Sequence, residues 1–130
     1  METPEIPKQM MLLAQEFEAC RHAFTAMGDE NRQRIIITML NNPGGIRVGE
    51  ITKYTNLSRP AVSHHLRILK EAGIVSMYKQ GTMHFYHVDA NESQWEQITG
   101  LITHINELVK EVSAKRENGE RCFGKQVEEE

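Results

Sequence analysis

Apolar residues recur every three or four positions near both ends of the chain, and this spacing predicts two amphipathic helices. One stripe covers residues 10–27 and the other residues 95–112. Such seams are typical of helices that pack along other helices, and one short core cannot bury both, so we expect a homodimer. The positions expected in this contact are Leu13, Phe17, Cys20, Trp95, Ile98, Ile102, Ile105 and Val109.

Three shorter helices are expected between the two seams. Asp29 begins the first, and the Asn-Pro-Gly-Gly stretch at 42–45 stops it. The second ends near Asn56, and the third runs from a Ser58 cap to Gly73. The apolar positions expected to face the core are Ile35, Ile36, Met39, Leu40, Val48, Ile51, Tyr54, Val62, Leu66 and Leu69.

After Gly73 the period of the pattern changes from that of a helix to that of a strand. Residues 74–78 and 83–88 are expected to be strands, and Gln80-Gly81 between them predicts a β-hairpin. The predicted fold is therefore mostly α with a small β-hairpin wing, in the order of four helices, two strands and one helix. We expect residues 1–116 to form one domain and residues 117–130 a disordered acidic tail.

The second and third short helices, with a tight turn around Leu57, have the pattern of a helix-turn-helix. In such motifs the second helix enters the major groove of DNA, and a following hairpin lies along the backbone. With its apolar stripe buried, this helix presents hydrogen-bond donors on its other face. We expect Arg59, Ser63 and His64 at base edges. The other DNA-binding positions expected are Pro60 on the same face and, at phosphates, Arg67, Lys70 and Lys79, the last at the tip of the hairpin.

Charge changes this picture only locally. The 130-residue chain has a net charge of −3, which argues against a general affinity for nucleic acid. Residues 53–87, however, hold five Lys and Arg residues against the single acid Glu71, and a local positive surface suits phosphate. No apolar run approaches the roughly 18 residues that span a bilayer, and the first residues do not resemble a secretory signal. We therefore expect a cytoplasmic protein that does not bind membranes.

The segment 58–75, SRPAVSHHLRILKEAGIV, resembles the recognition helix and following strand of ArsR-type (ArsR/SmtB) winged-helix repressors. Residues 27–36 are similar to the second helix of that family and residues 81–88 to its wing. The resemblance covers about residues 24–110. It implies a transcriptional repressor that binds a short inverted repeat in double-stranded DNA as a homodimer built on its first and last helices, and that an inducer releases.

The metal sites known from this family are incomplete here. Many relatives hold a metal with cysteines at the start of the third helix, where this chain has Arg47-Val48-Gly49. Others bind zinc on the last helix. The later half of that site is present as His104 and Glu107, but residues 91–93 read Asn-Glu-Ser, so two of the four ligands are missing. We expect no cofactor and rate His104 and Glu107 only as weak metal candidates.

The inducer stays open between two other classes. Cys20 and Cys122 are candidates for a thiol-reactive signal, although Cys20 in the apolar seam is better explained as a buried hydrophobic residue. A small organic ligand in the dimer seam is the other class. The sequence has no motif of a known enzyme class, so an enzyme is not expected. A winged-helix protein-interaction module without DNA binding is the alternative function.

Overall fold

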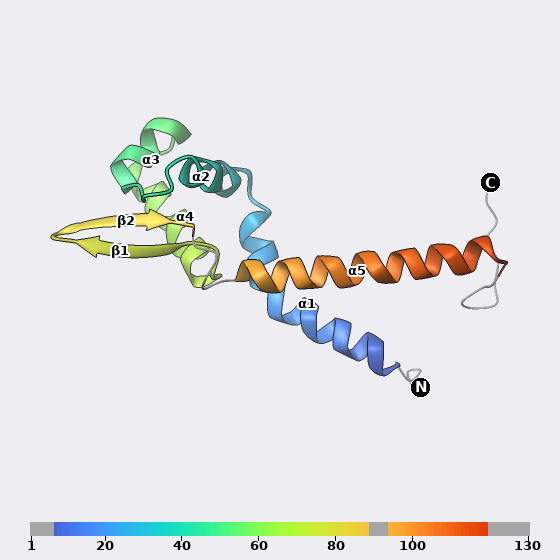
Figure 1. Ribbon diagram of the computed structural model, residues 1–130. Coiled ribbons are helices and arrows are strands. Elements are labelled where there is room, and N and C mark those ends of the chain that lie inside the picture. The colour runs from blue at the N-terminus through green and yellow to red at the C-terminus, as the bar shows by residue number, and fades with distance from the viewer. Residues whose placement is uncertain (1–6, 89–93, 120–130) are drawn as a thin grey trace, which may run out of the picture.

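A computed structural model describes residues 7–88 and 94–119 (Figure 1). Its elements follow the predicted order of four helices, a hairpin and a last helix, which confirms the predicted fold class. They are α1 (Lys8–Met27), α2 (Glu30–Leu40), α3 (Val48–Thr55), α4 (Arg59–Glu71), β1 (Ser76–Gln80), β2 (Met83–His87) and α5 (Gln94–Glu117). The predicted sites at residues 91–93, Cys122 and most of the acidic tail lie outside the described residues.

Helix α2 begins at its predicted cap. The Asp29 carboxylate accepts hydrogen bonds from the backbone N–H groups of Asn31 at 2.8 Å and Arg32 at 3.1 Å. These bonds satisfy donors that have no partner within the helix. The prediction that Leu40 faces the core is wrong, because its side chain is 61% exposed. At 3.6 residues per turn Leu40 lies about 140° around the helix from Ile35, outside the buried arc.

Helices α3 and α4 are joined by a turn that Asn56 makes possible. This residue has the left-handed backbone conformation, with φ of 61°, which asparagine tolerates better than most residues. The Ser58 hydroxyl then accepts the Ala61 N–H at 3.2 Å and caps α4. Within α3, Tyr54 was expected to face the core, but it is 63% exposed and Thr55 is buried instead. Thr55 follows Ile51 by four residues, so both lie on one face.

Gly73 ends α4 as predicted. Its φ of 78° reverses the chain, and the N–H groups of Gly73 and Ile74 donate to the carbonyls of Lys70 and Leu69 at 3.0 and 2.9 Å. This pair of bonds is a Schellman motif. Ile74 was expected to begin the first strand, but it precedes β1 and is buried in the core. The strand therefore has the predicted length of five residues but begins two residues later than predicted.

The two strands pair antiparallel, from Ser76 opposite His87 to Gln80 opposite Met83. The turn is therefore residues 81–82 rather than the predicted Gln80-Gly81, and Gly81 supplies its positive φ of 66°. The loop after α2 joins the hairpin, because Ile46 exchanges backbone hydrogen bonds of 3.0 and 2.9 Å with Tyr86. This bridge ties the wing to the helical body.

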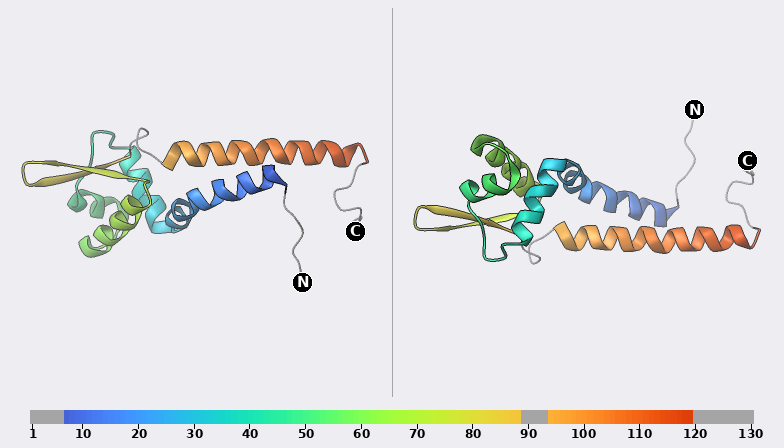
Figure 2. Two further views of the ribbon diagram at one scale, coloured as in Figure 1. Left: turned by 90° about the horizontal axis from the view of Figure 1, so that it is seen from below. Right: turned by 90° about the horizontal axis from the view of Figure 1, so that it is seen from above.

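The core lies where α2, α3, α4 and the base of the hairpin meet, and α1 and α5 extend from it. Both views in Figure 2 show the hairpin at one end of the molecule and the α1–α5 arm at the other. The Trp95 indole N–H donates to the Ile74 carbonyl at 3.1 Å and fixes the start of α5 to this body. The fully buried large side chains include Ile35, Met39, Ile46, Ile51, Val62, Leu66, Leu69, Ile74 and Leu101.

Candidate nucleic-acid interface

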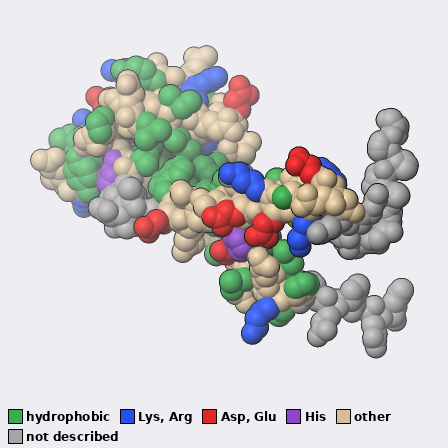
Figure 3. Space-filling view, turned by 45° about the vertical axis from the view of Figure 1, so that its right-hand side comes forward, with side chains coloured by type: hydrophobic (Ala, Val, Ile, Leu, Met, Phe, Trp, Pro, Cys, Tyr) green, Lys and Arg blue, Asp and Glu red, His purple; other side chains and the backbone are tan. Residues whose placement is uncertain are grey.

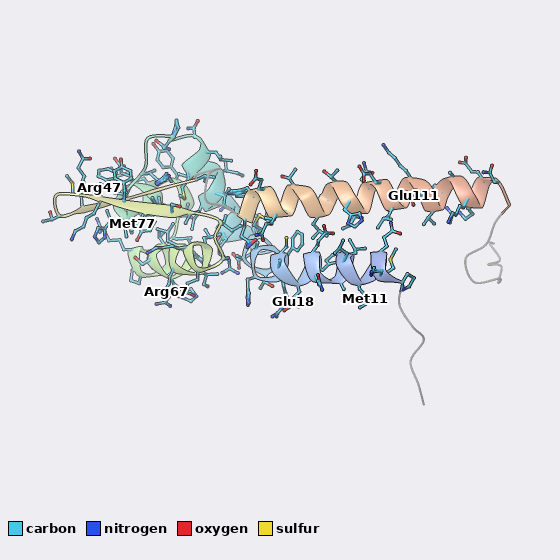
Figure 4. The ribbon with its side chains drawn as sticks, turned by 60° about the horizontal axis from the view of Figure 1, so that its bottom comes forward. Met11, Glu18, Arg47, Arg67, Met77 and Glu111 are labelled. Atoms are coloured by element: carbon cyan, nitrogen blue, oxygen red, sulfur yellow. The ribbon has the colours of Figure 1, made fainter. Side chains whose placement is uncertain are left out.

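The outer face of α4 carries the predicted DNA contacts. Val62, Leu66 and Leu69 are buried, which turns the opposite side of the helix outward. In Figure 4, Arg67 points away from the body on this side. Each predicted position is exposed, including the one on the hairpin: Arg59, Pro60, Ser63, His64, Arg67, Lys70 and Lys79. The structure thus presents these side chains to solvent, as a major-groove helix requires.

Two of these exposed side chains interact with each other. A guanidinium nitrogen of Arg67 lies 3.3 Å from Nδ1 of His64, one turn away on the same helix. Arginine is a donor only, so His64 Nδ1 is the acceptor, and Nε2 then carries the proton of the neutral ring. The Nε2–H of His64 is therefore a donor directed away from Arg67.

Arg59, the first residue of α4, lies back against α3. Its Nη2 atom is 2.5 Å from the point that a Cβ atom on Gly49 would occupy, and its Cζ atom is 3.3 Å from that point. Real Cβ atoms are not found at 2.5 Å from another heavy atom. The guanidinium thus occupies space that is open because residue 49 is glycine.

His65 points toward the helical body and contacts Arg32 of α2. The Arg32 side chain donates from Nε to the Ala26 carbonyl at 2.7 Å and approaches His65 Nδ1 with Nη1 at 3.2 Å. This arginine therefore links the end of α1, the start of α2 and the middle of α4. Burial lowers the pKa of His65, and the nearby Arg32 and His64 lower it further, while Asp29 opposes them.

Tyr78 of β1 links the wing to the loop that follows α2. Its ring stacks on Phe85 with 5.3 Å between centroids, and its hydroxyl donates to the Gly44 carbonyl at 2.8 Å. Lys79 follows Tyr78 and pairs with His84 across the hairpin. It therefore lies two residues before the Gly81-Thr82 tip, although it was expected at the tip itself. Lys79 is exposed on the wing.

The predicted seam residues divide into buried and exposed groups. Cys20 and Ile98 are buried between α1 and α5, whereas Phe17, Ile102 and Val109 are about half exposed, at 46, 50 and 54%. The space-filling view shows hydrophobic side chains on the surface of this arm (Figure 3). The remaining seam positions, Leu13, Trp95 and Ile105, are partly buried.

A groove of about 410 Å³ lies between α1 and α5, next to Cys20. Its walls include Glu16 from α1 and Gln97 and Leu101 from α5. Burial raises the pKa of the Cys20 thiol, and the Glu16 carboxylate raises it further. Since the thiolate is the reactive form, this environment disfavours reactivity of Cys20.

His104, a weak metal candidate, has a partner within the same chain. Its Nδ1 atom lies 2.6 Å from Oε1 of Glu16, so this pair ties α5 to α1. The other candidate, Glu107, is exposed on α5. The described residues contain no group of three or more His, Cys, Asp or Glu side chains that could hold a metal ion.

Sequence reasoning missed two residues of this site. They are Arg32 of α2 and Gly49 of α3, and neither lies on the outer face of α4, where the DNA contacts were expected. A glycine inside a predicted helix is the one signal that could have found Gly49, because it lowers helix stability without a visible reason.

Among the helices of the described residues, none is long and apolar enough to cross a membrane.

Comparison with known proteins gives one consistent group. The profile of the bacterial regulatory protein arsR family matches residues 29–77. The chain is 31% identical over 85 residues to the transcriptional repressor SdpR of Bacillus subtilis, which covers 65% of this chain and 91% of that protein. It is 38% identical over 74 residues to an uncharacterized HTH-type transcriptional regulator of Methanocaldococcus jannaschii, covering 57 and 82% of the two chains.

A solved structure shares the fold. An ArsR-like transcriptional regulator from Rhodococcus sp. RHA1 superposes with a TM-score of 0.67 at 20% identity, over 83% of this chain and 99% of that one. These relatives are transcriptional regulators, which confirms the prediction that the chain is not an enzyme.

Proposed function

The chain belongs to the ArsR family of bacterial regulatory proteins. We propose that this DNA-binding transcriptional regulator is a homodimeric repressor that binds a short palindromic DNA site. Repression is supported by the similarity to SdpR, which is itself named a repressor. A protein that covers a promoter site excludes the polymerase, so tight binding alone is a sufficient mechanism. A reporter whose promoter overlaps the bound site tests the sign: expression must rise when the protein is removed, and a fall would identify an activator.

The observation that carries DNA binding is the set of donors on the outer face of α4. Arg59, Ser63 and His64 are exposed on its first two turns, where a recognition helix reads base edges. Arg67 and Lys70 follow on the later turns. A helix used only for packing against a protein would need no such row of donors.

Two substitutions separate sequence reading from phosphate binding. Lys79→Ala should weaken binding to all duplexes alike and reduce the slope of log affinity against log salt by about 1. Arg59→Ala should instead reduce the preference for the best duplex, by roughly 1–3 kcal/mol. Fluorescence anisotropy with a duplex selected from a random library and a scrambled duplex measures both. If the two variants weaken both duplexes uniformly, this division of roles is wrong.

The dimer proposal rests on the uncovered apolar stripe of the arm. Ile102, Val109 and Val112 lie on one face of α5 and are each about half exposed, although isolated domains rarely leave a continuous apolar stripe in water. A two-fold pairing through this arm would cover the stripe and present two recognition helices to a palindrome.

Sedimentation of charged variants tests the dimer. Val109→Glu places a charge in the stripe and should give a monomer at micromolar concentration. Thr103→Glu is the matched control, because Thr103 is exposed on another face of the same helix and should leave the dimer intact. A wild-type chain that sediments as a monomer with full helicity would refute the proposal.

The inducer proposal favours a small organic ligand over a thiol reaction or a metal. The raised pKa of Cys20 disfavours the thiol route, whereas the groove beside it has the size of a small-molecule pocket. We expect zinc, cadmium and lead at modest concentration to leave the DNA complex intact. Release of the wild type by zinc, lost in His104→Ala, would restore the metal site. Release by oxidant, lost when Cys20 and Cys122 are both replaced by serine, would restore the thiol route.

A further inference from the structure

Gly49 and Arg59 form a contact that the proposed function does not yet explain. The guanidinium of Arg59 lies over the first turn of α3, with Nη2 2.5 Å and Nε 3.9 Å from the position of a Cβ on Gly49. The contact joins the first turns of the two helices of the helix-turn-helix. Any side chain at residue 49 would displace this guanidinium.

The backbone gives no reason for glycine at this position. Gly49 lies inside α3, and it is not among the glycines with positive φ, which are Gly45, Gly73, Gly81 and Gly119. Alanine would therefore fit the backbone and would favour the helix, since glycine is among the weakest helix formers. What alanine cannot do is share its space with the Arg59 side chain.

We propose that Gly49 is a positioning residue for sequence recognition: its missing side chain is the seat that holds the Arg59 guanidinium ready for DNA. The proposal rests on the proposed function, in which Arg59 reads base edges. A free arginine has many rotamers, and a side chain that is ordered only on binding loses that freedom at a cost in affinity. An arginine already seated on α3 loses less.

A side chain added at residue 49 would disturb only the Arg59 side chain. The atoms that a Cβ would meet belong to the far end of an exposed, flexible side chain and not to the backbone or the core. Gly49→Ala should therefore move Arg59 and leave the fold intact. A residue with a purely structural role would show the opposite result, with lower stability and an unchanged sequence preference.

The test compares five forms of the full chain on two duplexes, one selected by the wild type from a random library and one of the same composition with scrambled sequence. The forms are wild type, Gly49→Ala, Arg59→Ala, the double variant and Gly44→Ala. Gly44 is the matched control, because it also lacks a positive φ and a Cβ there would meet no atom within 4 Å. Melting temperatures are measured in parallel.

We expect Gly49→Ala to reduce the ratio of selected to scrambled affinity by about two- to tenfold, the range for one unordered long side chain. Its melting temperature should not fall. In the double variant the loss should equal that of Arg59→Ala alone, because both substitutions act through one guanidinium. Gly44→Ala should match the wild type in this ratio.

Two results would overturn the proposal. One is a Gly49→Ala variant that keeps the wild-type ratio. The other is a double variant in which the losses of Gly49→Ala and Arg59→Ala multiply. Either result would show that the two residues are not coupled. A wild type that binds both duplexes equally would instead refute the proposed function itself, and this inference with it.

Discussion

Among the exposed and partly buried polar side chains around α4, we expect the loss of Arg32 to lower the free energy of unfolding most. It donates to the Ala26 carbonyl at 2.7 Å and lies 3.2 Å from His65 Nδ1, and both contacts are partly buried. A hydrogen bond to a charged group contributes about 1.5–3 kcal/mol, with the lower part of the range for partly exposed pairs. Arg32→Ala, which removes both bonds, should therefore lower the free energy of unfolding by about 3–4 kcal/mol.

Urea unfolding followed by circular dichroism measures this loss. The protein concentration must be the same for every variant, because the stability of a dimer depends on it. Arg34→Ala is the matched control on the same helix. Arg34 faces Glu30 at 3.8 Å, and both side chains are largely in solvent, so that pair contributes at most about 1 kcal/mol.

The comparison of the two variants decides whether Arg32 joins the helices. A loss for Arg32→Ala that is no larger than the loss for Arg34→Ala would show that the contacts of Arg32 with α1 and α4 contribute nothing to stability. The role given to His65 as a partner of the scaffold would then also be wrong.

Three further predictions concern single groups. The pKa of His65 in the folded chain lies below its ordinary 6.5, so the unfolded chain binds more protons than the folded one as the pH falls through 6.5. Wild type should therefore lose stability relative to His65→Gln as the pH falls through this range, whereas above it the difference in stability between the two should not change with pH. Urea titrations at several pH values measure this. Asp29→Ala should cost about 1 kcal/mol through loss of the α2 cap, and because hydrogen bonding to the Arg32 N–H lowers the Asp29 pKa below 3.8, this difference should persist at neutral pH and shrink only in acid. Tyr78→Phe should cost about 0.5–1.5 kcal/mol through loss of the bond to Gly44, and an unchanged melting curve would contradict that role of the hydroxyl.

Periodicity predicted the elements because each has one buried face with a regular repeat. Val62, Leu66 and Leu69 follow the helical period, and all three are buried. The pattern failed where apolar residues lie at the edge of that face. Leu40 and Tyr54 are apolar letters at helix ends, yet Thr38 and Thr55 occupy the buried positions and donate their hydroxyls to backbone carbonyls of the preceding turn. A buried threonine satisfied in this way looks polar in the sequence.

Contacts between distant segments could not be predicted from the sequence. The bridge of Ile46 with Tyr86 and the approach of Arg32 to His65 join residues more than 30 positions apart, and no local spacing encodes them. The candidate DNA face was easier to predict, because it is the complement of one buried stripe on one helix. The orientation of Arg59 on that face could not be predicted, since it depends on the space above Gly49 in another helix.

In the proposed function, two copies of α4 read a symmetric sequence in double-stranded DNA. Sequencing the duplexes that the protein enriches from a random library shows whether they do. We expect an inverted repeat whose half-sites have centres about 10–10.5 base pairs, or a multiple of that spacing, apart. A library that shows no enrichment, or only a single half-site without its inverted copy, would contradict it.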